Sequence, residues 1–387
     1  MWDDYGLTSN INTLTRLNVF FKVIADATGI EDFVALTYLS IRQNALTSID
    51  LSNNTQLEIL VINDNNLNNL SISTNTQLEV LYAHNNTIAT IDFTNNAQLR
   101  AIKLNDNNLT SINVTNLSLL NELGISRNTI NTLDVSKNVN LWNLYADECG
   151  LSSIDLSTNN LLEELYLDNN TLTTLSITNM PNLIEFTAVN NSLSSINFNN
   201  NFDLEYLYLT DNNIITIDLS QNSNIRHLEV QNNNLESLNV KNGNNINYTK
   251  MYATGNPKLS CIEVDNENGA YLTATGGGNI LKWQKDAGAS FSENCGNISS
   301  INWTGNTNSS WLTGSNWSGS VAPIITDNVI IPNVATTPSI TTSVEINNLI
   351  VEALSSFDIS EDGSLTTDGD FINSGTFKIT STASSSG

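Results

Sequence analysis

Aliphatic residues recur along most of the chain at a constant spacing of 21 positions. Leucine or isoleucine begins ten successive turns, at Leu36, Leu57, Leu78, Leu99, Leu120, Leu141, Leu162, Leu183, Leu204 and Ile225. The pattern L-x-x-L-x-[LI]-x-x-N occurs twice per turn, as in LEILVINDN and LNNLSISTN within residues 57–77. A strict period of this length predicts a solenoid, in which neighbouring turns stack and bury a continuous core.

Each half-turn alternates buried-type and outward-type residues, as a strand with one buried face does. Leu60 and Ile62 alternate with Val61 and Asn63 in one half-turn. The other half-turns repeat this alternation. We therefore predict a mainly-β fold with short strands on both sides of each turn, paired into two parallel sheets across an aliphatic core.

One position near the end of the first half-turn is almost always asparagine. It is occupied by Asn44, Asn65, Asn86, Asn107, Asn128, Cys149, Asn170, Asn191, Asn212 and Asn233. A buried amide is costly unless it is hydrogen-bonded, so we expect each amide to bind backbone groups where the strand turns. Cys149 shares this position and lies far from any histidine in the repeat, which indicates a buried structural thiol rather than a nucleophile.

The repeats match the leucine-rich-repeat signature L-x-x-L-x-L-x-x-N/C-x-L. Their doubled half-pattern resembles the IRREKO class of these repeats, most closely in LTSIDLSNN (46–54) and LSSIDLSTN (151–159). Residues 14–36 resemble the start of an internalin repeat region, without the usual helical N-terminal cap. This resemblance implies a secreted or cell-surface protein with an adhesion-type role.

The periodicity loosens after Ile225. The segments GNPKLSCIEVD and FSENC resemble the C-terminal cap of secreted Bacteroidetes-type leucine-rich-repeat proteins, and that resemblance implies a disulfide between Cys261 and Cys295. From the residues alone, two cysteines that bracket a glycine-rich segment suit a closing loop. Two free thiols remain the alternative.

From about residue 297 the composition shifts to Ser, Thr, Asn and Gly. Residues 301–332 resemble a Trp-rich module of bacterial surface proteins, and residues 346–379 read as rungs of a smaller β-solenoid. We expect Trp303, Trp311 and Trp317 to cover the open apolar end of this second solenoid, with stacking on sugar rings as the alternative.

These features divide the chain into four parts. They are an N-terminal partial cap with a first irregular repeat (1–35), the repeat solenoid (36–250), a cap with a disulfide (251–296) and the β module (297–387), which we expect to be incomplete. The opening residues MWDDYGLTSN have neither the basic nor the apolar region of a signal peptide, so we expect a signal to be absent from this chain or removed from it.

The charge and hydropathy of the chain exclude two classes of partner. The 387 residues carry a formal net charge of −25 at pH 7, which disfavours nucleic acid and anionic membranes. No apolar run is long enough to cross a bilayer, so we expect no membrane insertion.

No catalytic constellation is evident. His84 and His227 are the only histidines, and seven turns at about 4.8 Å each separate them by more than about 30 Å. They therefore cannot share a metal or a proton. The many carboxylates are of the kind that solenoids expose to solvent, and we expect the protein not to be an enzyme.

The two outward faces differ in their variability. On the second half-turn, one outward column is only Ser, Thr and Asn and the next only Asp, Asn and Ser, which indicates a structural rule in which side chains pair along the ladder. On the first half-turn the outward residues vary, and seven of the ten tyrosines share that face. Exposed aromatic residues among charges are typical of a recognition surface.

We therefore predict a binding patch on the variable face. Its residues are Tyr145, Tyr166, Tyr206, Tyr208, Trp142, Asp147, Asp168, Glu164 and Glu185. The carboxylates would select a basic or hydroxyl-rich partner, or would hold Ca²⁺ between that partner and the protein. No other cofactor is expected.

The function predicted from these features is non-enzymatic binding of a protein ligand at a cell surface or in the extracellular space. A glycan-binding module of a polysaccharide-using bacterium is the first alternative, because tyrosine and carboxylate also suit sugars. A purely structural surface stalk is the second.

Overall fold

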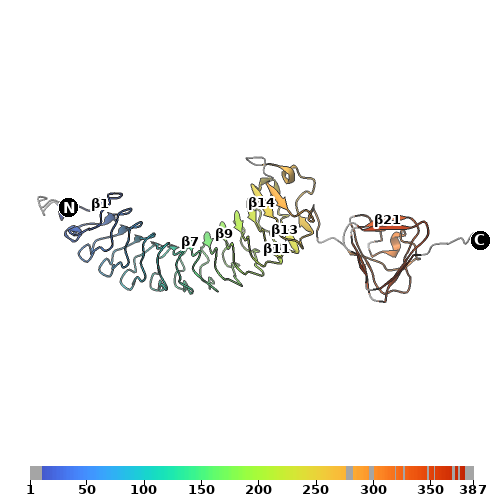
Figure 1. Ribbon diagram of the computed structural model, residues 1–387, viewed down its shortest axis with the longest axis horizontal. Coiled ribbons are helices and arrows are strands. Elements are labelled where there is room, and N and C mark those ends of the chain that lie inside the picture. The colour runs from blue at the N-terminus through green and yellow to red at the C-terminus, as the bar shows by residue number, and fades with distance from the viewer. Residues whose placement is uncertain are drawn as a thin grey trace, which may run out of the picture. The chain divides into compact units, whose positions relative to one another are not determined.

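The computed structural model describes residues 11–275, 282–295, 300–318, 320–325, 327–346, 348–352, 354–367, 371–373 and 375–379. Residues 1–10 of the predicted N-terminal part and 380–387 of the predicted module lie outside this description. The chain forms two compact units, Met1–Glu293 and Asn294–Gly387, both drawn in Figure 1.

The first unit is a solenoid with a 13-stranded parallel sheet along the inner side of its curve (Figure 1). From the second to the eleventh strand the central residue is buried, and neighbouring strands pair in register, so that Leu60 pairs with Leu81 and Leu144 with Leu165. In spatial order the strands are β1 (Arg16–Asn18), β2 (Tyr38–Ser40), β3 (Ile59–Val61), β4 (Val80–Tyr82), β5 (Ala101–Lys103), β6 (Glu122–Gly124), β7 (Asn143–Tyr145), β8 (Glu164–Tyr166), β9 (Glu185–Thr187), β10 (Tyr206–Tyr208), β12 (His227–Glu229), β14 (Lys250–Ala253) and β16 (Trp283–Lys285).

The outer side of the solenoid carries a much shorter sheet. Its four parallel strands are β11 (Thr216–Asp218), β13 (Ser237–Asn239), β15 (Cys261–Glu263) and β17 (Ser290–Ser292). The mainly-β solenoid is confirmed, but in the described part of the earlier turns the second half forms no strand.

The predicted asparagine column is hydrogen-bonded as expected, and its amides are buried except at Asn44 and Asn191, which are partly buried. Asn170 donates from Nδ2 to the carbonyls of Ala146 (2.9 Å) and Leu167 (3.0 Å), and its Oδ1 accepts the backbone N–H of Leu151 (2.9 Å). Cys149 donates from its thiol to the carbonyl of Ile125 at 3.3 Å. Burial raises the pKa of that thiol to about 12, which confirms a protonated structural cysteine.

A second buried asparagine column lies in the other half-turn, and the sequence reading did not single it out. Each amide donates to carbonyls of preceding turns, as Asn138 does to Val114 (2.9 Å) and Leu117 (2.8 Å). Leu117 and Met180 replace asparagine in two turns. The members that keep the amide are Asn54, Asn75, Asn96, Asn138, Asn159, Asn201 and Asn222.

The C-terminal end of the solenoid closes over an aromatic cluster. The ring of Trp283 lies 5.2 Å from Tyr248, 5.1 Å from Tyr271 and 5.7 Å from Phe291, measured between centroids. This cluster covers apolar core that a final turn would otherwise leave open. Cys261 and Cys295 are disulfide-bonded, as predicted, and Cys149 is free.

Short 3₁₀ segments are the only helices in the described residues. They are η1 (Ile30–Asp32), η2 (Asn245–Asn247), η3 (Ala270–Thr273) and η5 (Gly314–Asn316). No helix in this part of the chain has the length and apolar character needed to cross a membrane.

The second unit is a smaller solenoid of three parallel sheets. One sheet holds β18 (Ser300–Asn302), β19 (Asn328–Ile331), β22 (Asn348–Val351) and β25 (Phe371–Asn373). The others hold β20 (Ser339–Ile340), β23 (Ser356–Ile359) and β26 (Thr376–Ile379), and β21 (Ser343–Ile346) with β24 (Ser364–Thr367).

The three tryptophans belong to the core of this unit. Trp317 makes edge-on contacts with Trp303 and Trp311, at centroid distances of 4.9 and 4.7 Å. All three side chains are at most 2% exposed and pack with the strands of the unit. Stacking of sugar rings on these indoles is therefore excluded, because their faces are covered by protein.

Candidate binding surface

Two tyrosines on neighbouring strands form the centre of the variable face. Tyr145 ends β7 and Tyr166 ends β8, and their ring centroids are 4.9 Å apart. Each hydroxyl donates to a carboxylate on the next turn, Tyr145 to Glu164 and Tyr166 to Glu185. The sequence placed these four residues on one face, and the structure joins them into a tyrosine–glutamate strip.

The strip continues on β10 and β12. Thr187 is the small residue that pairs with both Tyr166 and Tyr208. The ring of Tyr208 lies 4.9 Å from the imidazole of His227, and Tyr206 lies 6.4 Å from it. The sequence reading left His227 out because a single imidazole carried no catalytic geometry.

Acidic side chains dominate this surface and affect the pKa of the tyrosine hydroxyls. Burial first, and then the bonded carboxylates of Glu164 and Glu185, raise the pKa of Tyr145 and Tyr166. Both phenols therefore stay neutral at physiological pH. Further along the strip, Glu229 accepts a contact of 2.7 Å from His227 Nε2 and lies 3.8 Å from Lys250 Nζ.

The carboxylates of Asp147 and Asp168 accept hydrogen bonds from neighbouring turns. Asp147 accepts the Ser126 hydroxyl at 3.0 Å and the backbone N–H of Asp168 at 2.9 Å. Asp168 accepts the hydroxyl of Thr187 and the backbone N–H of Val189. Burial raises the pKa of both carboxyl groups, so these aspartates form the partly buried border of the strip.

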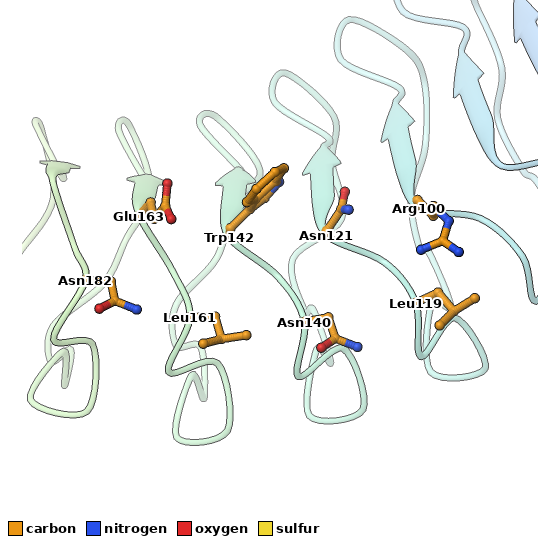
Figure 2. Close-up of a pocket in the computed structure, with 8 residues that line it drawn as sticks. All are labelled: Arg100, Leu119, Asn121, Asn140, Trp142, Leu161, Glu163 and Asn182. Carbon is orange, nitrogen blue, oxygen red and sulfur yellow. The ribbon is translucent and has the colours of Figure 1, made fainter.

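Trp142 lies apart from the tyrosines, on the flank of the solenoid just before β7. It projects into a groove of about 410 Å³, drawn in Figure 2. One row of groove residues immediately precedes the strands and the other lies on the adjoining loops. The lining residues are Arg100, Leu119, Asn121, Asn140, Trp142, Leu161, Glu163 and Asn182.

The opposite, uniform face follows a different rule from the predicted one. Its aspartates do not pair along the ladder in the described turns. Asp50 and Asp155 each accept the backbone N–H two residues ahead in their own turn, from Ser52 and Ser157, both at 2.9 Å. Asp and Asn recur in this column because they accept that local bond, whereas Ser71 and Ser176 contact the hydroxyl two residues ahead.

Metal binding has no preformed site in the described residues, where no three His, Cys, Asp or Glu side chains converge. A Ca²⁺ ion shared with a partner would need ligands from that partner, and it stays a prediction.

A family model described as a domain of unknown function (DUF8693) matches residues 302–385. No curated protein matches the chain. Among solved structures, the leucine-rich-repeat domain of APL1B is 18% identical, covering 70% of this chain and 87% of its own, with a TM-score of 0.52. The chain folds as a leucine-rich-repeat solenoid.

Two further structures share this fold. An internalin (InlF) of Listeria monocytogenes is 23% identical, covering 64% of this chain and 83% of its own, with a TM-score of 0.56. A structure described as a TDR receptor is 16% identical, covering 96% of this chain and 78% of its own, also with a TM-score of 0.56. Identities this low concern the fold of the leucine-rich-repeat solenoid and not its ligand.

Proposed function

We propose that this leucine-rich-repeat protein is a secreted or cell-surface binding protein that recognises a protein ligand and catalyses no reaction. The observation that carries the proposal is the tyrosine–glutamate strip on the inner sheet, centred on Tyr145 and Tyr166. Tyrosine is enriched at the energetic centres of protein interfaces, where it offers a large ring and one polar atom.

The charge of the strip indicates the chemistry of the partner. Glu164 and Glu185 accept hydrogen bonds from tyrosine hydroxyls and form no close ion pair in the described residues, although Lys103 attracts Glu164 at longer range. The whole chain carries −25. A partner with a basic surface would complement this face and would associate faster at low salt.

The disulfide supports location outside the cytoplasm. Disulfides persist mainly in oxidising compartments, and Cys261, in β15 of the solenoid cap, is bridged to Cys295. Surface or extracellular location also suits the family resemblance of the repeats.

The test uses the full chain and a paired variant, Tyr166→Ala with Tyr208→Ala. A protein ligand would be selected on an array of purified extracellular and surface proteins, and its affinity measured by surface plasmon resonance. Because two tyrosines of the strip are removed, affinity should fall at least about tenfold. The matched control is Thr174→Ala with Thr216→Ala, which alters exposed residues on the other half of the same two turns.

Three results would contradict the proposal. Unchanged affinity of the tyrosine variant, with its circular dichroism intact, would remove the strip as the site. Selection of oligosaccharides alone, with binding lost in the tyrosine variant, would replace the protein ligand by a glycan. No ligand of either kind would favour a structural stalk.

A further inference from the structure

The flank groove around Trp142 is separate from the tyrosine–glutamate strip and has its own chemistry. We propose that it is a binding site for a neutral oligosaccharide chain. This inference does not depend on recognition of a protein by the inner sheet.

Trp142 supplies the apolar platform. Its side chain is 47% exposed, whereas Trp283 in the cap and the three tryptophans of the second unit are at most 2% exposed. The fold does not require an indole at this position, because the equivalent residues of the adjacent turns are Asn121 and Glu163. An exposed indole face suits the C–H face of a pyranose ring, since both are flat and partly apolar.

Uncommitted polar side chains surround the indole in Figure 2. The side chains of Asn121, Glu163 and Asn182 make no hydrogen bond within the described part of the chain. Amides offer both donors and acceptors, and a carboxylate offers acceptors, which together match the hydroxyl groups of a sugar. Ligand sites combine an apolar lining with a few such polar groups.

The charges and the length of the groove limit the charge and the length of the ligand that it can bind. Arg100 and Glu163 are the charged residues of this lining, and Arg100 is ion-paired at 3.5 Å with Glu79, outside the lining, so the carboxylate of Glu163 disfavours an acidic glycan. The rows run from Arg100 to Glu163 and from Leu119 to Asn182, each crossing four turns, or roughly 14 Å at the usual strand spacing. A linear oligosaccharide of a few units fits this length.

The backbone of the groove argues against an extended peptide. The carbonyl of Trp142 accepts the N–H groups of Glu163 (2.8 Å) and Glu164 (3.0 Å), and that of Asn121 accepts the N–H groups of Trp142 (2.9 Å) and Asn143 (3.2 Å). These groups are therefore not free to pair with an added strand, which is how extended peptides usually bind.

The experiment titrates the full chain with cellohexaose, xylohexaose, mannohexaose, laminarihexaose and chitohexaose, followed by tryptophan fluorescence and calorimetry. At least one sugar should bind and shift the emission to shorter wavelength, because it removes water from Trp142. Trp142→Phe should abolish the shift, and Trp142→Ala should lower affinity at least tenfold. The matched control Ile184→Ala changes an exposed residue at the same position of a later turn, outside the groove lining, and should stay within twofold.

The outcomes separate this site from the inner sheet. The paired Tyr166→Ala, Tyr208→Ala variant should keep the affinity for sugar. The proposal is overturned if no sugar of the panel binds at millimolar concentration, if Trp142→Ala binds as the unaltered chain does, or if a peptide library yields Trp142-dependent ligands and the sugars do not.

Discussion

At the scale of single residues, chemically similar side chains have different structural roles on the two halves of a turn. Asn170 sits in a buried column and satisfies backbone groups of its own turn and of the preceding turn. Asp155 is exposed and bonds one N–H of its own turn. Asp147 is partly buried and accepts bonds between turns. Their substitutions should therefore differ in size and in pH dependence.

The first prediction compares Asn170→Ala with Asp155→Ala. Removing the Asn170 amide leaves buried carbonyl and N–H groups unpaired, which should cost about 1–3 kcal/mol of unfolding free energy. The loss for Asp155→Ala should be smaller, because water replaces the bond to Ser157. Urea denaturation measures both, and equal shifts of the two midpoints would show that the inward and outward columns are misassigned.

The second prediction concerns Asp147→Asn. Burial raises the pKa of Asp147 in the folded state above the usual 3.8, so the folded protein binds this proton more tightly than the unfolded chain does. Ionisation of Asp147 therefore reduces stability above the folded pKa, and this cost vanishes as the pH falls below 3.8. Asparagine can keep the ladder bond, since Asn105 accepts the N–H of Ser126 at 2.9 Å from the same column.

Asp147→Asn should accordingly raise the urea midpoint at pH 7, and the gain should shrink towards pH 4. Asp155→Asn is the matched control, and its effect on stability at pH 7 should have the opposite sign. The bonds from Ser157 lower the pKa of Asp155 in the folded state. That carboxylate adds stability above pH 3.8, and the contribution is lost as the pH falls through its folded pKa. A protein less stable at pH 7 after Asp147→Asn would contradict the assignment of burial as the dominant effect.

At the scale of elements, the sequence predicts what repeats and misses what depends on curvature or on neighbouring turns. The leucine positions and the first asparagine column follow from the 21-residue period, because each turn solves the same packing problem. The outer strands do not, since β11 and β13 have the same alternation as earlier turns that form no strand. The alternation in the sequence therefore does not by itself decide whether an outer ladder forms.

The candidate binding surfaces likewise combine features that the repeat predicts with features that depend on neighbouring turns. The sequence places Tyr145 and Tyr166 on adjacent strands because they occupy equivalent positions. It does not reveal that their hydroxyls are taken by Glu164 and Glu185, since those bonds cross from one turn to the next. The flank groove around Trp142 was also missed, because its rows have no periodic residue type and become a surface only when four turns stack.

At the scale of the whole molecule, the buried apolar side chains of the described residues form two cores that share no residue. One runs through the solenoid and its cap, and the other holds the tryptophans of the second unit. The bridge between Cys261 and Cys295 ties β15, within the cap of the first core, to a residue 34 positions along the chain. Closing a loop of this size is worth about 3–4 kcal/mol in the chain-entropy account.

The third prediction follows from this arrangement. Calorimetry of the full chain should resolve two unfolding transitions, because separate cores lose their packing separately. Reduction of the disulfide should lower the temperature of the solenoid transition by several degrees and leave the transition of the tryptophan-rich unit, followed by its near-ultraviolet circular dichroism, unchanged. Cys149 should react with an alkylating agent only once the solenoid unfolds, since its thiol is buried and protonated. Equal shifts of both transitions on reduction would contradict the stabilisation of the solenoid cap by the bridge. Alkylation of Cys149 in the native protein would contradict the burial of its thiol.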